Sequence, residues 1–168
     1  PGSTFKPFMA IAALTTGSAL LAGCSPLGLL NASSAIGSQR VREAVPYDRG
    51  RHPRRVLDLY APNAAQPSGG WPMVLFFYGG SWNNGSRGDY RFVGEALAAR
   101  GVVTAVADYR LYPEVRFPDF VDDCAMALAW CLGEAAGLDA NPRQVFVMGH
   151  SAGAYNAAML ALDPRWLQ

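Results

Sequence analysis

A serine flanked by glycines is the residue of this 168-residue chain best suited to covalent chemistry. Residues 145–153 read Val-Phe-Val-Met-Gly-His-Ser-Ala-Gly, and an alanine-rich segment follows them. A G-x-S-x-G pattern between an apolar strand and a helix is typical of a sharp turn that exposes the serine hydroxyl. The alternative is an ordinary turn serine. The flanking segments favour Ser151 as a nucleophile, with Gly149, His150 and Gly153 completing the turn.

A second loop has the composition needed to stabilise the negative charge that a serine nucleophile creates on a carbonyl oxygen. The apolar run 73–78 opens into Gly79-Gly80-Ser81-Trp82. Backbone N–H groups of such a loop can donate to the developing oxyanion, and loss of one donor costs about 3 kcal/mol of transition-state stabilisation. We expect an oxyanion hole whose candidate donors are the N–H groups of Gly79, Gly80, Ser81 and Ala152.

The segments that position these residues alternate between short apolar runs and stretches of helical spacing. This alternation is typical of a parallel sheet covered by helices. We predict a three-layer α/β/α sandwich with a mostly parallel sheet, truncated after the helix that follows Ser151. Strands are expected at 41–45, 56–60, 73–78, 102–107 and 145–148, and helices at 90–100, 117–136 and 152–162.

The order of the motifs resembles that of the α/β-hydrolase superfamily over residues 41–166. The resemblance is closest to the esterase/lipase branch, which includes enzymes related to hormone-sensitive lipase, feruloyl esterases and arylformamidase-like enzymes. It implies hydrolysis of a small-molecule carboxylic ester through an acyl-enzyme at Ser151, without a cofactor; an amide such as an N-formyl group is the alternative substrate. The motifs are Asp58-Leu59-Tyr60-Ala61-Pro62, the Gly-Gly-Ser-Trp loop, Asp108-Tyr109-Arg110-Leu111-Tyr112-Pro113-Glu114, Phe117-Pro118, Asp122-Asp123 and the Gly149–Gly153 turn.

Two features depart from that family. Tyr78 stands where the family usually has histidine, which leaves the backbone donors of the loop intact. Family members also place the triad acid and then the histidine after the serine, whereas the only histidines here are His52 and His150. We therefore expect this chain to be catalytically incomplete. The rival interpretation is a non-catalytic, membrane-anchored binding module on a truncated hydrolase scaffold.

Three aspartates precede the serine and match family positions that we interpret as structural rather than as the triad acid: Asp108, Asp122 and Asp123. An arginine cluster near the start of the domain is interpreted as a solvated edge rather than a binding patch: Arg49, Arg51, Arg54 and Arg55.

The overall charge gives no reason to expect a nucleic-acid partner. Fourteen basic and thirteen acidic residues leave a formal charge of +1, whereas nucleic-acid-binding domains are strongly basic. No Cys-x-x-Cys motif or histidine cluster provides zinc ligands. Cys124 and Cys131 are seven residues apart in a predicted helix, about 10 Å along its axis and beyond the roughly 7 Å reach of a disulfide. We expect both to be buried thiols.

The first forty residues have the layout of a secretory signal. Lys6 precedes an apolar run from Phe8 to Leu21, and Leu21-Ala22-Gly23-Cys24 resembles the lipobox of bacterial lipoproteins. A retained membrane-spanning helix is the alternative. We predict a signal peptide at 1–23, lipidation of Cys24, a flexible tether at 24–40 and the N-terminal part of a hydrolase domain at 41–168. The protein would then be an exported lipoprotein anchored in the bacterial cell envelope.

Overall fold

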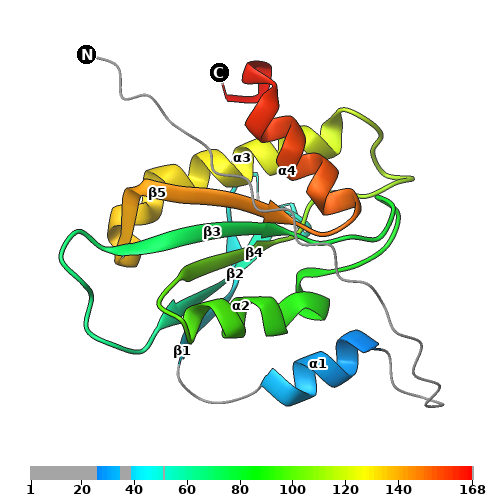
Figure 1. The fold of residues 1–168 in the computed structure, drawn as a ribbon. Coiled ribbons are helices and arrows are strands. Elements are labelled where there is room, and N and C mark those ends of the chain that lie inside the picture. The colour runs from blue at the N-terminus through cyan, green and yellow to red at the C-terminus, as the bar shows by residue number, and fades with distance from the viewer. Residues whose placement is uncertain (1–25, 35–38, 51, 168) are drawn as a thin grey trace.

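A five-stranded mixed sheet forms the centre of the molecule (Figure 1). The computed structural model describes residues 26–34, 39–50 and 52–167. The strands lie side by side in the order β1-β2-β4-β3-β5, so that β5 is an edge strand. Their bounds are Gln39–Pro46 for β1, Val56–Pro62 for β2, Trp71–Phe77 for β3, Val103–Ala107 for β4 and Ala140–Gly149 for β5.

Strand β2 alone runs against the direction of the other strands. It pairs antiparallel with both β1 and β4, whereas β3 pairs parallel with β4 and with β5. The prediction of a mostly parallel sheet is therefore confirmed. All five predicted strands exist, but β5 begins at Ala140 rather than at Val145, because Ala140 already pairs with Trp71 of β3.

Helices cover both faces of the sheet, which confirms the three predicted layers (Figure 1). Helices α1 and α2 lie on one side, and α3 and α4 lie on the other. The last helix begins and ends where the sequence predicted. The bounds are Pro26–Ser34 for α1, Arg91–Ala98 for α2, Asp119–Glu134 for α3 and Ala152–Leu162 for α4.

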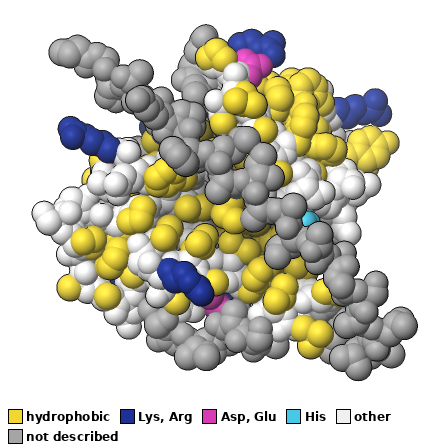
Figure 2. Space-filling model, in the orientation of Figure 1, with side chains coloured by type: hydrophobic (Ala, Val, Ile, Leu, Met, Phe, Trp, Pro, Cys, Tyr) yellow, Lys and Arg dark blue, Asp and Glu magenta, His cyan; other side chains and the backbone are white. Residues whose placement is uncertain are grey.

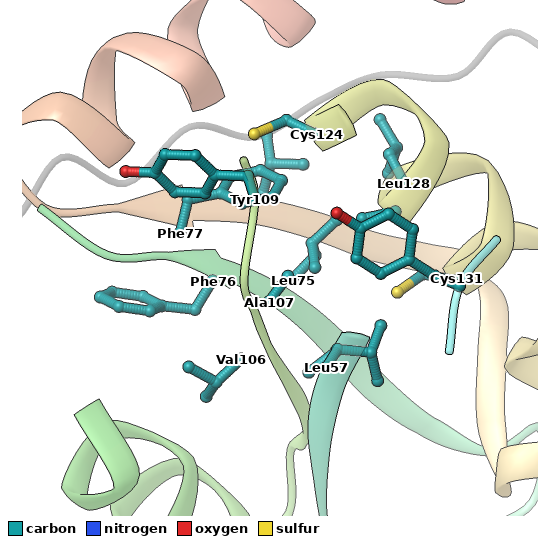
Figure 3. Packing of buried hydrophobic residues seen from close by; sticks show 14 of the residues in the cluster. Leu57, Leu75, Phe76, Phe77, Val106, Ala107, Tyr109, Cys124, Leu128 and Cys131 are labelled. Carbon is teal, nitrogen blue, oxygen red and sulfur yellow. The ribbon is translucent and has the colours of Figure 1, made fainter. Parts of the chain in front are cut away.

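The core packs against both faces of the central strands β3 and β4. Phe77 points toward α3, where Cys124 and Cys131 lie, whereas Phe76 and Val106 lie on the α2 side (Figure 3). This division follows from the alternation of side chains along a strand. Both cysteines are buried free thiols, as predicted, and burial raises the pKa of each.

The segment expected to be a flexible tether is partly helical. Residues Pro26–Ser34 form α1, and Asn31 ties this helix to the 3₁₀ helix Arg87–Tyr90 and to α2. Its Nδ2 donates to the Gly88 carbonyl at 3.0 Å, and its Oδ1 accepts the N–H of Phe92 at 2.9 Å. Sequence spacing gave no sign of these contacts, because the partners are 57 and 61 residues away.

The predicted signal peptide and Cys24 lie outside the described residues. Within the described ranges, every helix is too short or too polar to cross a bilayer.

Buried carboxylates of α3, of β2 and of the loop after β4 form ion pairs with arginines. Asp123 of α3 is fully buried and accepts hydrogen bonds from the side chains of Arg55 and Arg110 at 2.8–3.0 Å. Arg87 in turn bridges Asp58 of β2 at 2.7 Å and Asp108 after β4 at 2.5 Å. We call these six side chains the arginine–carboxylate network.

The prediction of a solvated arginine edge is wrong for two of its four members. Arg55 belongs to the network, and Arg54 donates to the Tyr78 hydroxyl and to the carbonyls of Gly85 and Tyr109. Both side chains turn inward because buried acceptors lie below them. Arg49 is exposed, and Arg51 lies outside the described residues.

Candidate active site

Ser151 occupies a strained turn between the end of β5 and the start of α4. Its backbone angles are φ 52° and ψ −116°, a combination that costs a non-glycine residue free energy. The turn is held against β3, since Phe77 lies beside Gly149 in the sheet and the Phe77 carbonyl accepts the N–H of His150 at 3.1 Å. The serine side chain is exposed at the N-terminus of α4.

The two glycines of the turn are required because backbone segments approach closely there. A Cβ on Gly149 would lie 2.2 Å from the carbonyl oxygen of Gly153. A Cβ on Gly153 would lie 2.1 Å from the carbonyl oxygen of Phe77. Any side chain at either position would force the strand, the turn and the helix apart.

The glycine loop that follows β3 lies directly against this turn. A Cβ on Gly79 would lie 3.0 Å from the Cβ of Ser151 and 2.9 Å from Nδ1 of His150. The structure therefore brings together the two segments that the sequence assigned to the nucleophile and the oxyanion hole. Parallel pairing of β3 with β5 causes this, because it places their carboxyl ends at the same edge of the sheet.

The loop turns through consecutive residues of positive φ: Gly80 at 134°, Ser81 at 50° and Trp82 at 57°. The carbonyl of Gly80 accepts the N–H groups of Asn83 and Asn84 at 3.1 and 3.0 Å. Two hydrogen bonds to one carbonyl fix this turn, so that its conformation exists before any substrate binds.

The predicted oxyanion donors differ in whether their N–H groups are free. Burial raises the pKa of Tyr90, and the nearby backbone N–H of Gly79 partly offsets the effect, so this N–H faces the Tyr90 hydroxyl. Within the described part of the chain, the N–H groups of Gly80 and Ser81 have no partner. Ala152 begins α4, where the helix itself provides no acceptor for the N–H. Gly80, Ser81 and Ala152 thus keep their donors available.

Tyr78, which replaces the usual histidine, points into the core rather than into the site. Its side chain is fully buried and stacks on Tyr109 with ring centroids 4.7 Å apart. Arg54 donates to its hydroxyl at 2.7 Å, and the Tyr109 hydroxyl donates to its carbonyl at 2.8 Å. The substitution therefore anchors the glycine loop from below.

Trp82 anchors the other end of the loop. Its ring stacks on Phe120 of α3 and meets Tyr155 of α4 edge-on, with centroids 5.4 and 5.5 Å apart. Its indole Nε1–H donates to Asn156 of α4 at 3.0 Å. Sequence analysis did not identify Asn156; the available signal was an amide side chain within the otherwise apolar stretch of α4.

An exposed aromatic surface extends from this anchor. Tyr112, Phe117 and Tyr155 are each about half exposed, and Phe117 packs against Phe120. Figure 2 shows apolar side chains gathered at the upper right of the molecule, over α4 and the segment that leads into α3.

Neither histidine is placed as a base for Ser151. His150 Nδ1 lies 2.8 Å from the Tyr90 hydroxyl. In the loop before β2, His52 Nδ1 accepts the N–H of Arg54 and Nε2 lies 2.7 Å from Glu114. Tyr90 is a second residue that the sequence analysis missed, because its partner is sixty residues away.

The aspartates that precede the serine are also engaged or remote. The carboxylates of Asp108 and Asp123 belong to the arginine–carboxylate network, and Asp122 is exposed on α3. In the ranges that the structure describes, no three histidine, cysteine or acidic side chains gather as a metal site would require.

Comparison with known proteins links the site to esterases. The sequence pattern of the BD-FAE family matches residues 57–165. A probable isoprenylcysteine alpha-carbonyl methylesterase of Oryza sativa subsp. japonica is 36% identical over 125 residues, 74% of this chain and 28% of that protein. Carboxylesterase NlhH of Mycobacterium tuberculosis is 38% identical over 92 residues, 54% of this chain and 28% of that protein.

Solved structures show the same fold. A hyperthermophilic esterase from Pyrobaculum calidifontis superposes with a TM-score of 0.70 and 29% identity, over 83% of this chain and 44% of that one. This chain spans only part of its relatives: it covers 28% of the length of each of the two curated proteins described above.

Proposed function

The chain belongs to the BD-FAE family of the α/β-hydrolase superfamily, and from that membership we propose that it carries the nucleophile half of a serine carboxylesterase. Its substrate would be a small-molecule carboxylic ester, as the esterase names of its relatives suggest. The observation that carries the proposal is the contact between the exposed, strained Ser151 and the glycine loop after β3.

In the proposed reaction, Ser151 Oγ attacks the ester carbonyl carbon while a base removes the hydroxyl proton. The carbonyl oxygen becomes negative and accepts hydrogen bonds from the N–H groups of Gly80, Ser81 and Ala152. The C–O bond to the alcohol then breaks, the alcohol leaves with the proton, and an acyl-enzyme remains. Water hydrolyses this intermediate and restores the serine. Gly79 allows the glycine loop to approach Ser151 closely, since a Cβ there would lie 3.0 Å from the Cβ of the serine.

We assign the base and the triad acid to sequence beyond the described residues. His52 and His150 already bond other groups, and Asp108 and Asp123 bind arginines. A serine without its base loses most of its reactivity. Residues 1–168 alone are therefore expected to be inactive, and the full-length gene product to be active.

A fluorophosphonate probe tests the proposal, because it captures an activated serine covalently. The full-length gene product is incubated with the probe, and the modified peptide is identified by mass spectrometry. We expect an adduct at Ser151, none in Ser151→Ala, and an unchanged adduct in Ser68→Ala, an exposed serine before the opposite end of β3. A folded full-length protein that stays unlabelled at Ser151 contradicts the proposal.

We also propose that Cys24 carries a lipid and anchors the domain to the membrane, on the strength of the sequence pattern at 21–24. Growth of the producing bacterium with an alkyne-tagged fatty acid should label the protein, and Cys24→Ser should abolish the label. Equal labelling of both forms would refute the anchor.

A further inference from the structure

The side chain of Asn156 is a buried polar group at the centre of the site's support. It is fully buried in α4, five residues after Ser151. Its Oδ1 accepts the indole N–H of Trp82 at 3.0 Å, and its Nδ2 donates to Cys124 Sγ at 3.4 Å. An indole N–H can only donate, so this contact fixes which end of the amide faces Trp82.

The Asn156 contact with Trp82 is a directional bond between two strained segments, which also meet where Gly79 lies against Ser151 and where the Trp82 ring packs edge-on against Tyr155. Trp82 is the last of three consecutive residues of positive φ that start at Gly80, and Asn156 belongs to α4, which begins directly after the strained Ser151. Ring stacking on Phe120 holds the Trp82 plane, but stacked rings can slide at little cost in energy. A directional hydrogen bond fixes the position of the indole along α4.

We propose that Asn156 is a positioning residue that holds the N–H groups of Gly80 and Ser81 at their working distance from Ser151. It acts through Trp82 and touches no substrate. Its catalytic consequence rests on the proposed function, but the positioning itself does not. A displacement of about 1 Å in such a constellation costs on the order of 100-fold in rate.

The first test measures the rate of phosphonylation at Ser151 in the full-length gene product. Asn156→Leu removes the acceptor, and Trp82→Phe removes the donor while it keeps the stacked ring. Each change should slow labelling by about 10- to 100-fold. The double variant should be no slower than either single variant, because the two changes break one bond. Asn156→Asp, which keeps the acceptor oxygen, should recover most of the rate.

A matched control separates positioning from general packing. Cys124→Ala removes the other partner of Asn156 and leaves the bond to Trp82 in place. We expect it to lower the melting temperature without slowing phosphonylation. Labelling rates that follow melting temperature across all the variants, or effects of the two single changes that multiply in the double variant, would overturn the inference.

The second test needs no activity and uses residues 1–168 labelled with ¹⁵N. Asn156→Leu should shift the Trp82 indole N–H resonance and the amides of Gly80 and Ser81, and leave those of β2 and β4 in place. If the natural protein does not react with the probe, the proposed function fails while these shifts still decide the positioning. Unmoved indole and loop resonances would overturn it.

Discussion

The candidate active site and the arginine–carboxylate network are built by opposite means, although both connect loops at the ends of neighbouring strands. At the site, uncharged backbone segments touch so closely that Gly149 and Gly153 leave no room for a Cβ. In the network, the fully buried Asp123 holds two loops through charged hydrogen bonds to Arg55 and Arg110. Shape therefore determines the position of the nucleophile, and buried charge determines the stability of the framework around it. Changes to the two regions should have separable effects.

The largest loss of stability should come from the network. Asp123→Ala leaves the partly buried guanidinium and the N–H of Arg110 without their acceptor, and leaves Arg55 with Asp48 as its remaining carboxylate partner. Removal of one partner from a buried ion pair costs about 3–5 kcal/mol. Urea unfolding of residues 1–168 measures the loss, and Asp122→Ala, the exposed neighbour on α3, should change stability by less than about 0.5 kcal/mol. Similar losses in both variants would remove the contrast on which the comparison rests.

Overpacking of the turn at Ser151 should lower the free energy of unfolding less than Asp123→Ala does. It should reduce the reactivity of Ser151 more. Gly153→Ala places a methyl group against the Phe77 carbonyl, and such strain typically costs about 1–3 kcal/mol. Phosphonylation of Ser151 in the full-length gene product should fall below detection, because the turn must open. The control is Gly133→Ala in α3, where a Cβ meets open space and alanine should stabilise the helix by about 0.5–1 kcal/mol. Phosphonylation of Ser151 in Gly153→Ala at the natural rate would show that the close approach of Gly153 to the Phe77 carbonyl is not needed for reactivity.

Alkaline pH should act on the buried tyrosines, which include the stacked pair below the glycine loop, rather than on the arginines of the network. Burial raises the pKa of both Tyr78 and Tyr109 above the usual value of about 10. The native state keeps these protons while the unfolded chain releases them, so stability should fall as pH rises above about 10 and be unaffected by these groups below that value. Each tyrosine contributes at most about 1.4 kcal/mol per pH unit.

Chemical unfolding between pH 8 and 11 measures the slope, and Tyr109→Phe should flatten it. The hydrogen bond to Asp123 raises the pKa of Arg110, so that this arginine keeps its charge over the same range. A slope that Tyr109→Phe leaves unaltered would point to other groups.

The smallest effect should come from a charge pair at the surface. Arg40 of β1 and Asp139 lie 2.7 Å apart, with side chains 55% and 40% exposed. Such pairs contribute about 0.2–1 kcal/mol, so Arg40→Ala should lower the free energy of unfolding by no more than that in 0.15 M salt. A loss as large as that of Asp123→Ala would mean that burial does not separate strong from weak pairs in this protein.

The sequence was sufficient for the parts of the structure that local pattern determines. The turn at Ser151 and helix α4 were both predictable, because the glycines, the apolar strand and the alanine-rich helix are contiguous. The approach of the Gly79 loop depends on the parallel pairing of β3 with β5, a neighbour relation that the sequence pattern did not predict. The direction of β2 was not predictable, since an apolar run reads the same way for either orientation.

The supporting contacts could not be predicted because their partners are far apart in the sequence. Arg54 resembled a surface residue until the fold placed Tyr78 beside it, and Asn31 resembled part of a linker until α1 lay against α2. Asn156 and Tyr90 each bond a residue sixty or more positions away. Composition and spacing carry no information about such pairs.

The place of β5 at the edge of the sheet bears on the order in which a growing polypeptide can acquire its structure. Strands β2, β3 and β4 leave the ribosome before β5, and they already possess one another as pairing partners. The serine and the Asn156 amide, which anchors Trp82 from 74 residues downstream, arrive together on the β5–α4 unit. The nucleophile therefore gains its position only when this unit docks on β3, and the base that we assign to later sequence must still be added before the serine can react.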